Sequence, residues 1–296
     1  MSIRATTRQF LKELHRKTAD DDILNGAAVL GFYLMLAIFP AMIFVLAVIP
    51  YLPIANIDQA IMDLLRQALP ASAADMFAGV VQDVTQEQRG DLLSFGLLVA
   101  LWATSTGMYA IMQQLNIAYD VDEGRGFLRA RLVAIALSLL FVVLVLGGFS
   151  LIVLGGQIQE WLGSRFGFDG ALLAFFIVFR WMLILAGLLL AFSVIYYLAP
   201  NVEQKFKFIT AGSVVGVVVL LVASLAFAWY TQSFGTYDAT YGSVGAVMVL
   251  MMWLFIAGFA ILFGSEINVL IERHDAGGKQ NDGNAIGQRK RDPDTR

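Results

Sequence analysis

The sequence predicts an all-α, polytopic membrane protein: a bundle of six transmembrane helices with amphipathic helices capping its outer face. Two observations predict this fold. Hydrophobic residues make up 58% of the 296 residues and charged residues only 15%, against roughly 25% charged residues in an average soluble domain. Six apolar stretches also reach the length of about 20 residues that an α-helix needs to cross a membrane. The stretches are continuous rather than alternating, which excludes a transmembrane β-barrel.

The six stretches are the predicted spans. The first of them is too long for the apolar part of a cleaved signal peptide, and a polar segment of 26 residues precedes it,. The spans cover residues 27–49, 92–118, 132–154, 171–199, 209–230 and 243–271.

The distribution of Lys and Arg predicts the orientation of the bundle. Sixteen of these residues lie in the two tails and in the turns after the second and fourth spans, whereas three lie in the segments on the opposite side. Because Lys and Arg concentrate on the cytoplasmic side of a membrane protein, both termini are expected in the cytoplasm of a bacterial cell, with the protein in its inner membrane.

Three segments lie outside the spans. Residues 1–26 form an N-tail in which apolar and basic residues alternate, as in an amphipathic helix on the inner leaflet,. Residues 50–91 have helical apolar spacing on both sides of Pro70 and many acidic residues, which predicts a helical cap on the outer face,. This cap is either a lid that packs on the bundle or a gate or partner surface. The polar C-tail, residues 272–296, is predicted to be disordered,.

Two charged side chains stand within apolar stretches and are candidate functional groups, because an ionisable group in hydrocarbon is costly. Glu266 lies about 8 Å inside the inner surface when counted from Ile271 at 1.5 Å per residue. It serves either a polar cavity or a hydrogen bond to Asn268 or to the backbone. Arg180 lies at the outer interface beside Trp181 if Pro200 marks the inner end of its span, and near the midplane if Ala171 marks the outer end.

The second span is unusually polar, and four of its polar residues recur three to four positions apart, so they share one helical face. They are Thr106, Tyr109, Gln113 and Asn116. This stripe either joins helices together or lines a polar cavity shared with Arg180 and Glu266. No direct ion pair between Arg180 and Glu266 is predicted, and Asp238, in the outer loop before the last span, is an alternative candidate partner for Arg180.

Other motifs limit the possible chemistry. There is no cysteine and there are only two histidines, so no thiol chemistry and no Ser-His-Asp triad is expected. No nucleotide-binding P-loop or HExxH motif is present, and no cofactor or metal site is predicted. The net charge of −3 argues against a nucleic-acid partner and leaves membrane lipids,. Gly212 and Gly216 form a GxxxG pair, which is typical of close helix packing.

The last span and the segment before it carry the motif of a known family. They contain Tyr-Gly-Ser-Val-Gly-Ala at 241–246, Trp-Leu at 253–254 and Gly-Ser-Glu-Ile-Asn at 264–268. The chain therefore resembles the YihY/virulence factor BrkB family, whose pattern here is YGS-x-GA, then WL, then GAE-x-N. Ser265 replaces the commoner alanine. The likeness covers roughly residues 20–272 and includes Ala27–Leu34, Trp102–Tyr119 and Tyr196–Pro200.

The resemblance implies six spans and leaves the function open. Some members of the family have been labelled as a ribonuclease, and others have been suggested to move lipids. RNA hydrolysis requires a basic surface and a metal or acid–base site, which this sequence does not offer. We therefore expect a transporter or flippase for a lipid-like or anionic amphiphile. The alternative is a non-transporting scaffold or envelope-integrity protein, and an enzyme is the weakest interpretation.

Overall fold

The computed structural model describes residues 3–48, 90–166, 170–202, 204, 206–233 and 243–289, and all regular structure in this part of the chain is helical. The predicted cap lies outside the described residues, apart from its last two residues, and so does Asp238. The helices are α1 (Ile3–Asp20), α2 (Ile23–Val48), α5 (Gly90–Ala118), α6 (Phe127–Phe166), α7 (Gly170–Leu198), α8 (Ala211–Ser233) and α10 (Ser243–Arg289).

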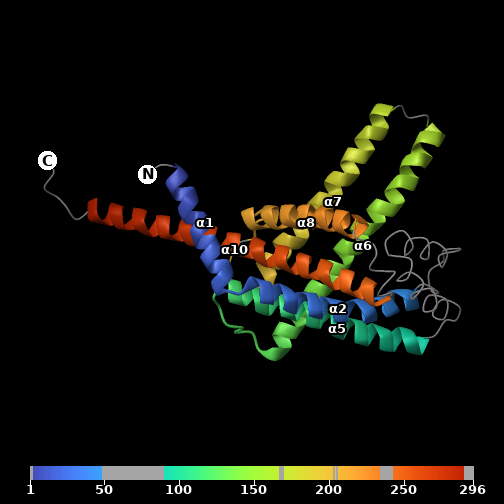
Figure 1. Ribbon diagram of the computed structural model, residues 1–296, viewed down its shortest axis with the longest axis horizontal. Coiled ribbons are helices and arrows are strands. Elements are labelled where there is room, and N and C mark those ends of the chain that lie inside the picture. The colour runs from blue at the N-terminus through green and yellow to red at the C-terminus, as the bar shows by residue number, and fades with distance from the viewer. Residues whose placement is uncertain are drawn as a thin grey trace.

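Helix α10 is the central element of the bundle. It packs against α2 and α8, while α5 packs along α2 (Figure 1). Helices α6 and α7 rise from this group as a pair, and α1 turns away from the start of α2. The start of α1 and the end of α10 lie toward the same end of the molecule (Figure 1).

Small residues allow α10 to approach both of its neighbours closely. A Cβ atom added at Gly264 would lie 2.6 Å from the carbonyl oxygen of Gly212 in α8, and one added at Gly258 would lie 3.1 Å from the carbonyl oxygen of Ala27 in α2. Such contacts are the usual means of helix association in membranes, where apolar surface alone gives no preference for protein over lipid. The close packing predicted from the GxxxG pair at Gly212 and Gly216 is confirmed.

The predicted number of spans is not confirmed. Four of the described helices are long and apolar enough to cross a membrane, and a fifth span is obtained if α1 and α2, bent by 53° at their junction, are counted as one. The predicted span at 92–118 is helical but more polar, and it is not among these. A count of six spans stays a prediction. The candidates are Phe127–Val145, Ala174–Leu198, Ala211–Thr231 and Val247–His274.

Two helices extend beyond the apolar stretches that predicted them. Helix α6 begins at Phe127, so Arg129 and Arg131 lie in its first turns rather than in a connecting loop. Helix α10 continues to Arg289, which differs from the disordered tail expected from residue 272. Elongation of an existing helix needs no new nucleus, so a polar, glycine-containing segment can continue a helix that it would not start.

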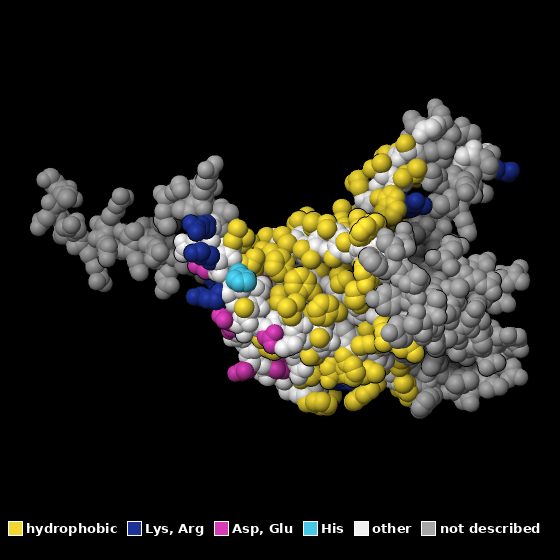
Figure 2. Space-filling view, viewed as in Figure 1, with side chains coloured by type: hydrophobic (Ala, Val, Ile, Leu, Met, Phe, Trp, Pro, Cys, Tyr) yellow, Lys and Arg dark blue, Asp and Glu magenta, His cyan; other side chains and the backbone are white. Residues whose placement is uncertain are grey.

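Charged side chains gather at one end of the described surface. Figure 2 shows hydrophobic side chains across the middle of the bundle, and acidic, basic and histidine side chains at the end where α1 lies. A lipid-facing belt next to a charged end is the distribution expected for a helical membrane protein.

Candidate functional site

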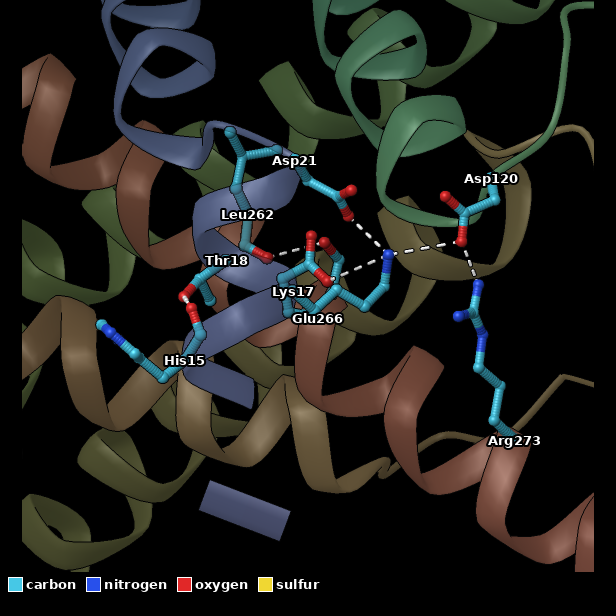
Figure 3. A network of polar contacts seen from close by, with 9 residues as sticks. His15, Lys17, Thr18, Asp21, Asp120, Leu262, Glu266 and Arg273 are labelled. Carbon is cyan, nitrogen blue, oxygen red and sulfur yellow. Dashed lines mark hydrogen bonds and ion pairs between the residues drawn. The ribbon is translucent and has the colours of Figure 1, made fainter. Parts of the chain in front are cut away.

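The charged end is organised around the side chain of Lys17, which is buried although it is a lysine. We call the group of five charged residues at this position the Lys17 network (Figure 3). Its members come from α1, from the corner after α1, from the loop after α5 and from α10. They are Lys17, Asp21, Asp120, Glu266 and Arg273.

Three carboxylates surround one ammonium group in this network. The Nζ atom of Lys17 donates hydrogen bonds to Oδ2 of Asp21 at 2.5 Å and to Oδ2 of Asp120 at 3.4 Å. It lies 3.6 Å from Oε2 of Glu266, which is an ion pair but too long for a hydrogen bond,. Arg273 provides a second cation through its bond to Asp120. The network therefore joins three carboxyl groups to two basic side chains.

Glu266 is the least satisfied member of the network. Its side chain is 0% exposed, and neither carboxylate oxygen has a hydrogen-bond partner among the described residues. The neighbouring Ser265 hydroxyl donates instead to the carbonyl oxygen of Leu262. A buried carboxylate that lacks hydrogen bonds is costly, so its presence requires either compensation by Lys17 or a functional reason.

Two corners of the backbone bring the aspartates to Lys17. Asp22 has φ of 48° and Asp120 has φ of 54°. Both angles lie in the left-handed region, which Asp tolerates better than most side chains. The first corner ends α1 and places Asp21 beside Lys17, four residues earlier. The second corner ends α5 and turns Asp120 toward α1 and α10.

Asp120 is outside the spans, and its charge is held by the basic members of the network. Partial burial would raise the pKa of the Asp120 carboxyl, but the hydrogen bond from Arg273 and the charges of Lys17 and Arg273 hold it below its ordinary value. Asp120 therefore remains ionised, and the loop after α5 stays attached to α1 and α10, at any pH above the usual range for aspartate.

Apolar contacts hold α1 against α10 next to the network. Leu14 is buried with Ile267 and Leu270 of α10. Nε2 of His274 lies 2.8 Å from Oε2 of Glu13, on the exposed side of the same contact. The N-tail is therefore helical as predicted, and one face of this helix contacts protein.

A second polar group closes the same end of the bundle between α5 and α7. Asn116 donates from Nδ2 to Oε2 of Glu123 at 3.1 Å and accepts at Oδ1 from the backbone N–H of Asn201 at 2.7 Å. Arg125 pairs with Glu123 at 2.7 Å and donates to the carbonyl oxygen of Ala199 at 2.7 Å. Partial burial would raise the pKa of Glu123, but the hydrogen bonds and charge of Arg125 hold it below its ordinary value.

The structure places the residues of the predicted stripe in different surroundings. Thr106 accepts a hydrogen bond from Nη2 of Arg131 at 2.8 Å. Tyr109 packs partly against the core, Gln113 is exposed, and Asn116 is buried and bonded as described above. The four residues share a helix but do not meet one another around Glu266. A cavity that includes them stays a prediction.

Asn268 and Arg180 are also separate from Glu266. Oδ1 of Asn268 accepts a hydrogen bond from the backbone N–H of Gly212 at 2.8 Å, and so fixes α8 to α10. The guanidinium of Arg180 lies 5.9 Å from the ring of Trp181, and its Nε atom is buried without a hydrogen-bond partner in the described part of the chain. Arg180 precedes Leu198 by 18 residues, or about 27 Å of helix. It also follows Gly170, the first residue of α7, by 10 residues, or about 15 Å,, so the choice between the outer interface and the midplane stays a prediction.

The sequence pattern does not identify Lys17, Asp120 or Arg131 as site residues. In the sequence, Lys17 is one of several basic residues of the N-tail, although the run of aspartates at 20–22 that follows it is a signal for an ion pair. Arg131 was assigned to a loop, yet it lies on α6 with its guanidinium 4.0 Å from the centre of the Trp102 ring. Within the described residues, no group of three or more His, Cys, Asp or Glu side chains could hold a metal ion.

The apolar helices, the hydrophobic belt and the charged end together define a multi-pass helical membrane protein. The chain belongs to the family described as Virulence factor BrkB, whose family model matches residues 14–286. The family resemblance inferred from the motifs around Glu266 is confirmed.

The relatives carry two kinds of name. A protein named as ribonuclease-like, YfkH of Bacillus subtilis (strain 168), is 35% identical over 264 residues, which cover 89% of this chain and 95% of the relative. A UPF0761 membrane protein of Tolumonas auensis is 24% identical, with 90% and 86% of the two chains covered. Another, from Alkalilimnicola ehrlichii, is 24% identical, and there the match spans 59% of the relative. No solved structure matches the chain.

Proposed function

We propose that this BrkB-family protein is a transporter or flippase of the bacterial inner membrane that moves an anionic, lipid-like amphiphile. The single observation that carries the proposal is Glu266, a fully buried carboxylate without a hydrogen-bond partner among the described residues and 3.6 Å from Lys17. A group of this kind is expensive in a membrane protein and is a functional candidate by default.

The Lys17 network serves as the inner end of the proposed pathway. Its position at the charged end of the bundle, together with the excess of Lys and Arg in the tails, supports cytoplasmic termini,. Movement of α1 away from α10 would separate Lys17 from Glu266. A proton then takes the place of the ammonium by neutralising the carboxylate of Glu266, and the anionic substrate is repelled less. This exchange supplies a coupling step to a protein whose sequence has no nucleotide-binding loop.

Arg180 serves as the outer group. A guanidinium matches the oxygens of a phosphate head group, and Arg180 lies about 27 Å along α7 from its inner end. The apolar chains of the amphiphile would follow the exposed apolar faces of the neighbouring helices. In this proposal Arg180 and Glu266 act at opposite ends of the path and do not form an ion pair.

A scaffold without transport is the second candidate, and a specific observation favours it. Several buried polar groups are paired within the bundle: Asn116 with Glu123, Asn268 with Gly212, and the hydroxyl of Tyr196 with the carbonyl oxygen of Ile261 at 2.8 Å. Polar groups paired in this way hold helices together and need no substrate. Ribonuclease activity is not proposed, because the composition provides neither a basic surface nor a catalytic constellation.

Reconstituted vesicles distinguish these candidates. The wild type, Arg180→Gln, Glu266→Gln and the control Lys12→Gln are placed in vesicles that contain a trace of fluorescent phosphatidylglycerol or phosphatidylcholine. A membrane-impermeant reductant is added outside, and the loss of the fluorescence that was protected in the inner leaflet is followed. Lys12 is exposed on α1. We expect the wild type and the control to move the anionic lipid, and each of the two other variants to be slowed about tenfold, the equivalent of one lost interaction of about 1.4 kcal/mol.

Two results contradict the proposal. Wild-type vesicles that exchange lipid no faster than vesicles without protein exclude flippase activity toward this lipid class and favour the scaffold. Variants that fold and transport as fast as the control show that Arg180 and Glu266 are structural groups.

A further inference from the structure

Arg131 is a membrane-level cation that the proposed pathway does not use. It is the fifth residue of α6, one turn after the loop that joins α5 to α6, and the first turns of α6 contact α5. Its Nη2 atom donates to Oγ1 of Thr106 at 2.8 Å and to the carbonyl oxygen of Trp102 at 3.2 Å. These two bonds fix the guanidinium against α5.

The charge of Arg131 has no acidic partner among the residues that the structure describes. Both acceptors of its Nη2 atom are neutral, and within the described part of the chain its buried Nε atom and its Nη1 atom have no hydrogen-bond partner. The Trp102 ring offers a cation–π contact at 4.0 Å, which is worth only about 0.5–2 kcal/mol. Among the described residues, two donor groups of this guanidinium, Nε and Nη1, and its charge are therefore left without a partner.

The surroundings of Arg131 are apolar and exposed. Phe127 and Leu128, which precede it by four and three residues and so share its helix face, are 77% and 71% exposed. Trp102 is 63% exposed and Leu132 is 58% exposed. In a membrane protein such a surface faces acyl chains, and Trp is typical of the level where acyl chains meet head groups.

We propose that Arg131 and the exposed side chains of Trp102, Phe127 and Leu128 form a binding site for an anionic phospholipid of the inner leaflet. A phosphate oxygen of the head group accepts from Nη1 of Arg131 and supplies the missing negative charge. The acyl chains lie on the Trp102, Phe127 and Leu128 side chains. Basic sites between transmembrane helices on the cytoplasmic side recognise phospholipid head groups by this chemistry.

This inference does not depend on transport, because a lipid that is bound tightly here need not cross the membrane. The site is also separate from the Lys17 network, whose basic members, Lys17 and Arg273, already contact carboxylates.

Native mass spectrometry tests the site on the whole protein. Wild type, Arg131→Gln and Arg131→Lys are purified from nanodiscs of phosphatidylcholine with one part in five phosphatidylglycerol, and retained lipids are counted. Arg129→Gln is the matched control, because Arg129 lies on the same turn and is exposed. We expect wild type and control to prefer phosphatidylglycerol. The preference should fall about tenfold or more in Arg131→Gln, as expected for loss of a charge-assisted hydrogen bond, and less in Arg131→Lys.

Each outcome decides the question. Equal retention of phosphatidylglycerol by Arg131→Gln and wild type overturns the proposal, and so does an equal loss in Arg129→Gln, which would indicate nonspecific charge attraction. Displacement of the lipid by millimolar inorganic phosphate would show that the site takes free phosphate rather than a lipid, and would also overturn it. If Arg131→Gln does not fold, the comparison of Arg131→Lys with Arg129→Gln carries the test, and equal lipid preference in these two variants refutes the site.

Discussion

Replacement of Lys17 by methionine tests the energetic role of the Lys17 network. Methionine keeps the unbranched length of the side chain and removes the ammonium, which leaves Glu266 buried without its ion-pair partner. Removal of one partner from a buried pair costs about 3–5 kcal/mol. We expect the lower end of this range. Asp120 is 54% exposed and also pairs with Arg273, so water and Arg273 compensate for most of the Lys17–Asp120 attraction that is lost,.

Unfolding in detergent, followed by the fluorescence of the five tryptophans, measures this cost. A loss of about 3 kcal/mol corresponds to a fall in the midpoint temperature of roughly 6–12 °C, at about 2–4 °C per kcal/mol for a chain of this size. The control Lys12→Met removes an exposed charge from the same helix, and we expect a change within about 0.5 kcal/mol.

The double variant Lys17→Met with Glu266→Gln isolates the interaction. An uncharged amide no longer needs the ammonium, so the part of the lost stability that comes from Glu266 should return, whereas the part that comes from Asp21 should not. The coupling between the two sites should be about 0.5–3 kcal/mol. The reasoning is refuted if Lys17→Met is no less stable than Lys12→Met, or if the double variant is as unstable as Lys17→Met alone.

Three further predictions concern helix packing, acid stability and membrane orientation. Gly264→Ala should destabilise the protein by about 1–3 kcal/mol in the same unfolding assay, because the new Cβ would collide with the hydroxyl of Tyr196; an unchanged midpoint would contradict this packing. Because the pKa of Asp120 is lowered in the folded protein, its contribution to the free energy of unfolding is complete above the unfolded-state pKa of about 3.9. It is lost as the pH falls through the still lower folded-state pKa. The variant Asp120→Asn, which has no charge to lose, should therefore weaken the acid dependence of unfolding below about pH 4. Because the chain has no cysteine, Asp75→Cys should react with a membrane-impermeant thiol reagent on intact cells and Gly283→Cys should not, and the opposite labelling would reverse the predicted orientation.

Most of the helical bundle was predictable because lipid imposes simple requirements on sequence. A span must be long, apolar and helical, since its backbone has no other hydrogen-bond partners. The predicted stretches at 92–118 and 171–199 therefore end within two residues of α5 and α7. The ends of α6 and α10 were less predictable, because a helix that leaves the membrane no longer needs apolar residues.

The charged site was predictable only in part. The sequence indicated that Glu266 is buried, because a lone carboxylate stands in an apolar run. It did not identify Lys17 as the partner, because that contact depends on how α1 folds back at a corner where Asp22 takes a left-handed backbone angle. Asn268, an expected partner of Glu266, is instead bonded to the backbone of α8.

The close contacts made by Gly258 and Gly264 have a mechanical consequence. Backbone atoms of α10 meet those of α2 and α8 with almost no side chain between them, and such a contact cannot slide or rotate without a steric clash. Helices α2, α8 and α10 therefore behave as one rigid unit. Helices α6 and α7 extend away from it as a pair (Figure 1), and large rearrangements of the spans should be sought in this pair, which carries both Arg131 and Arg180.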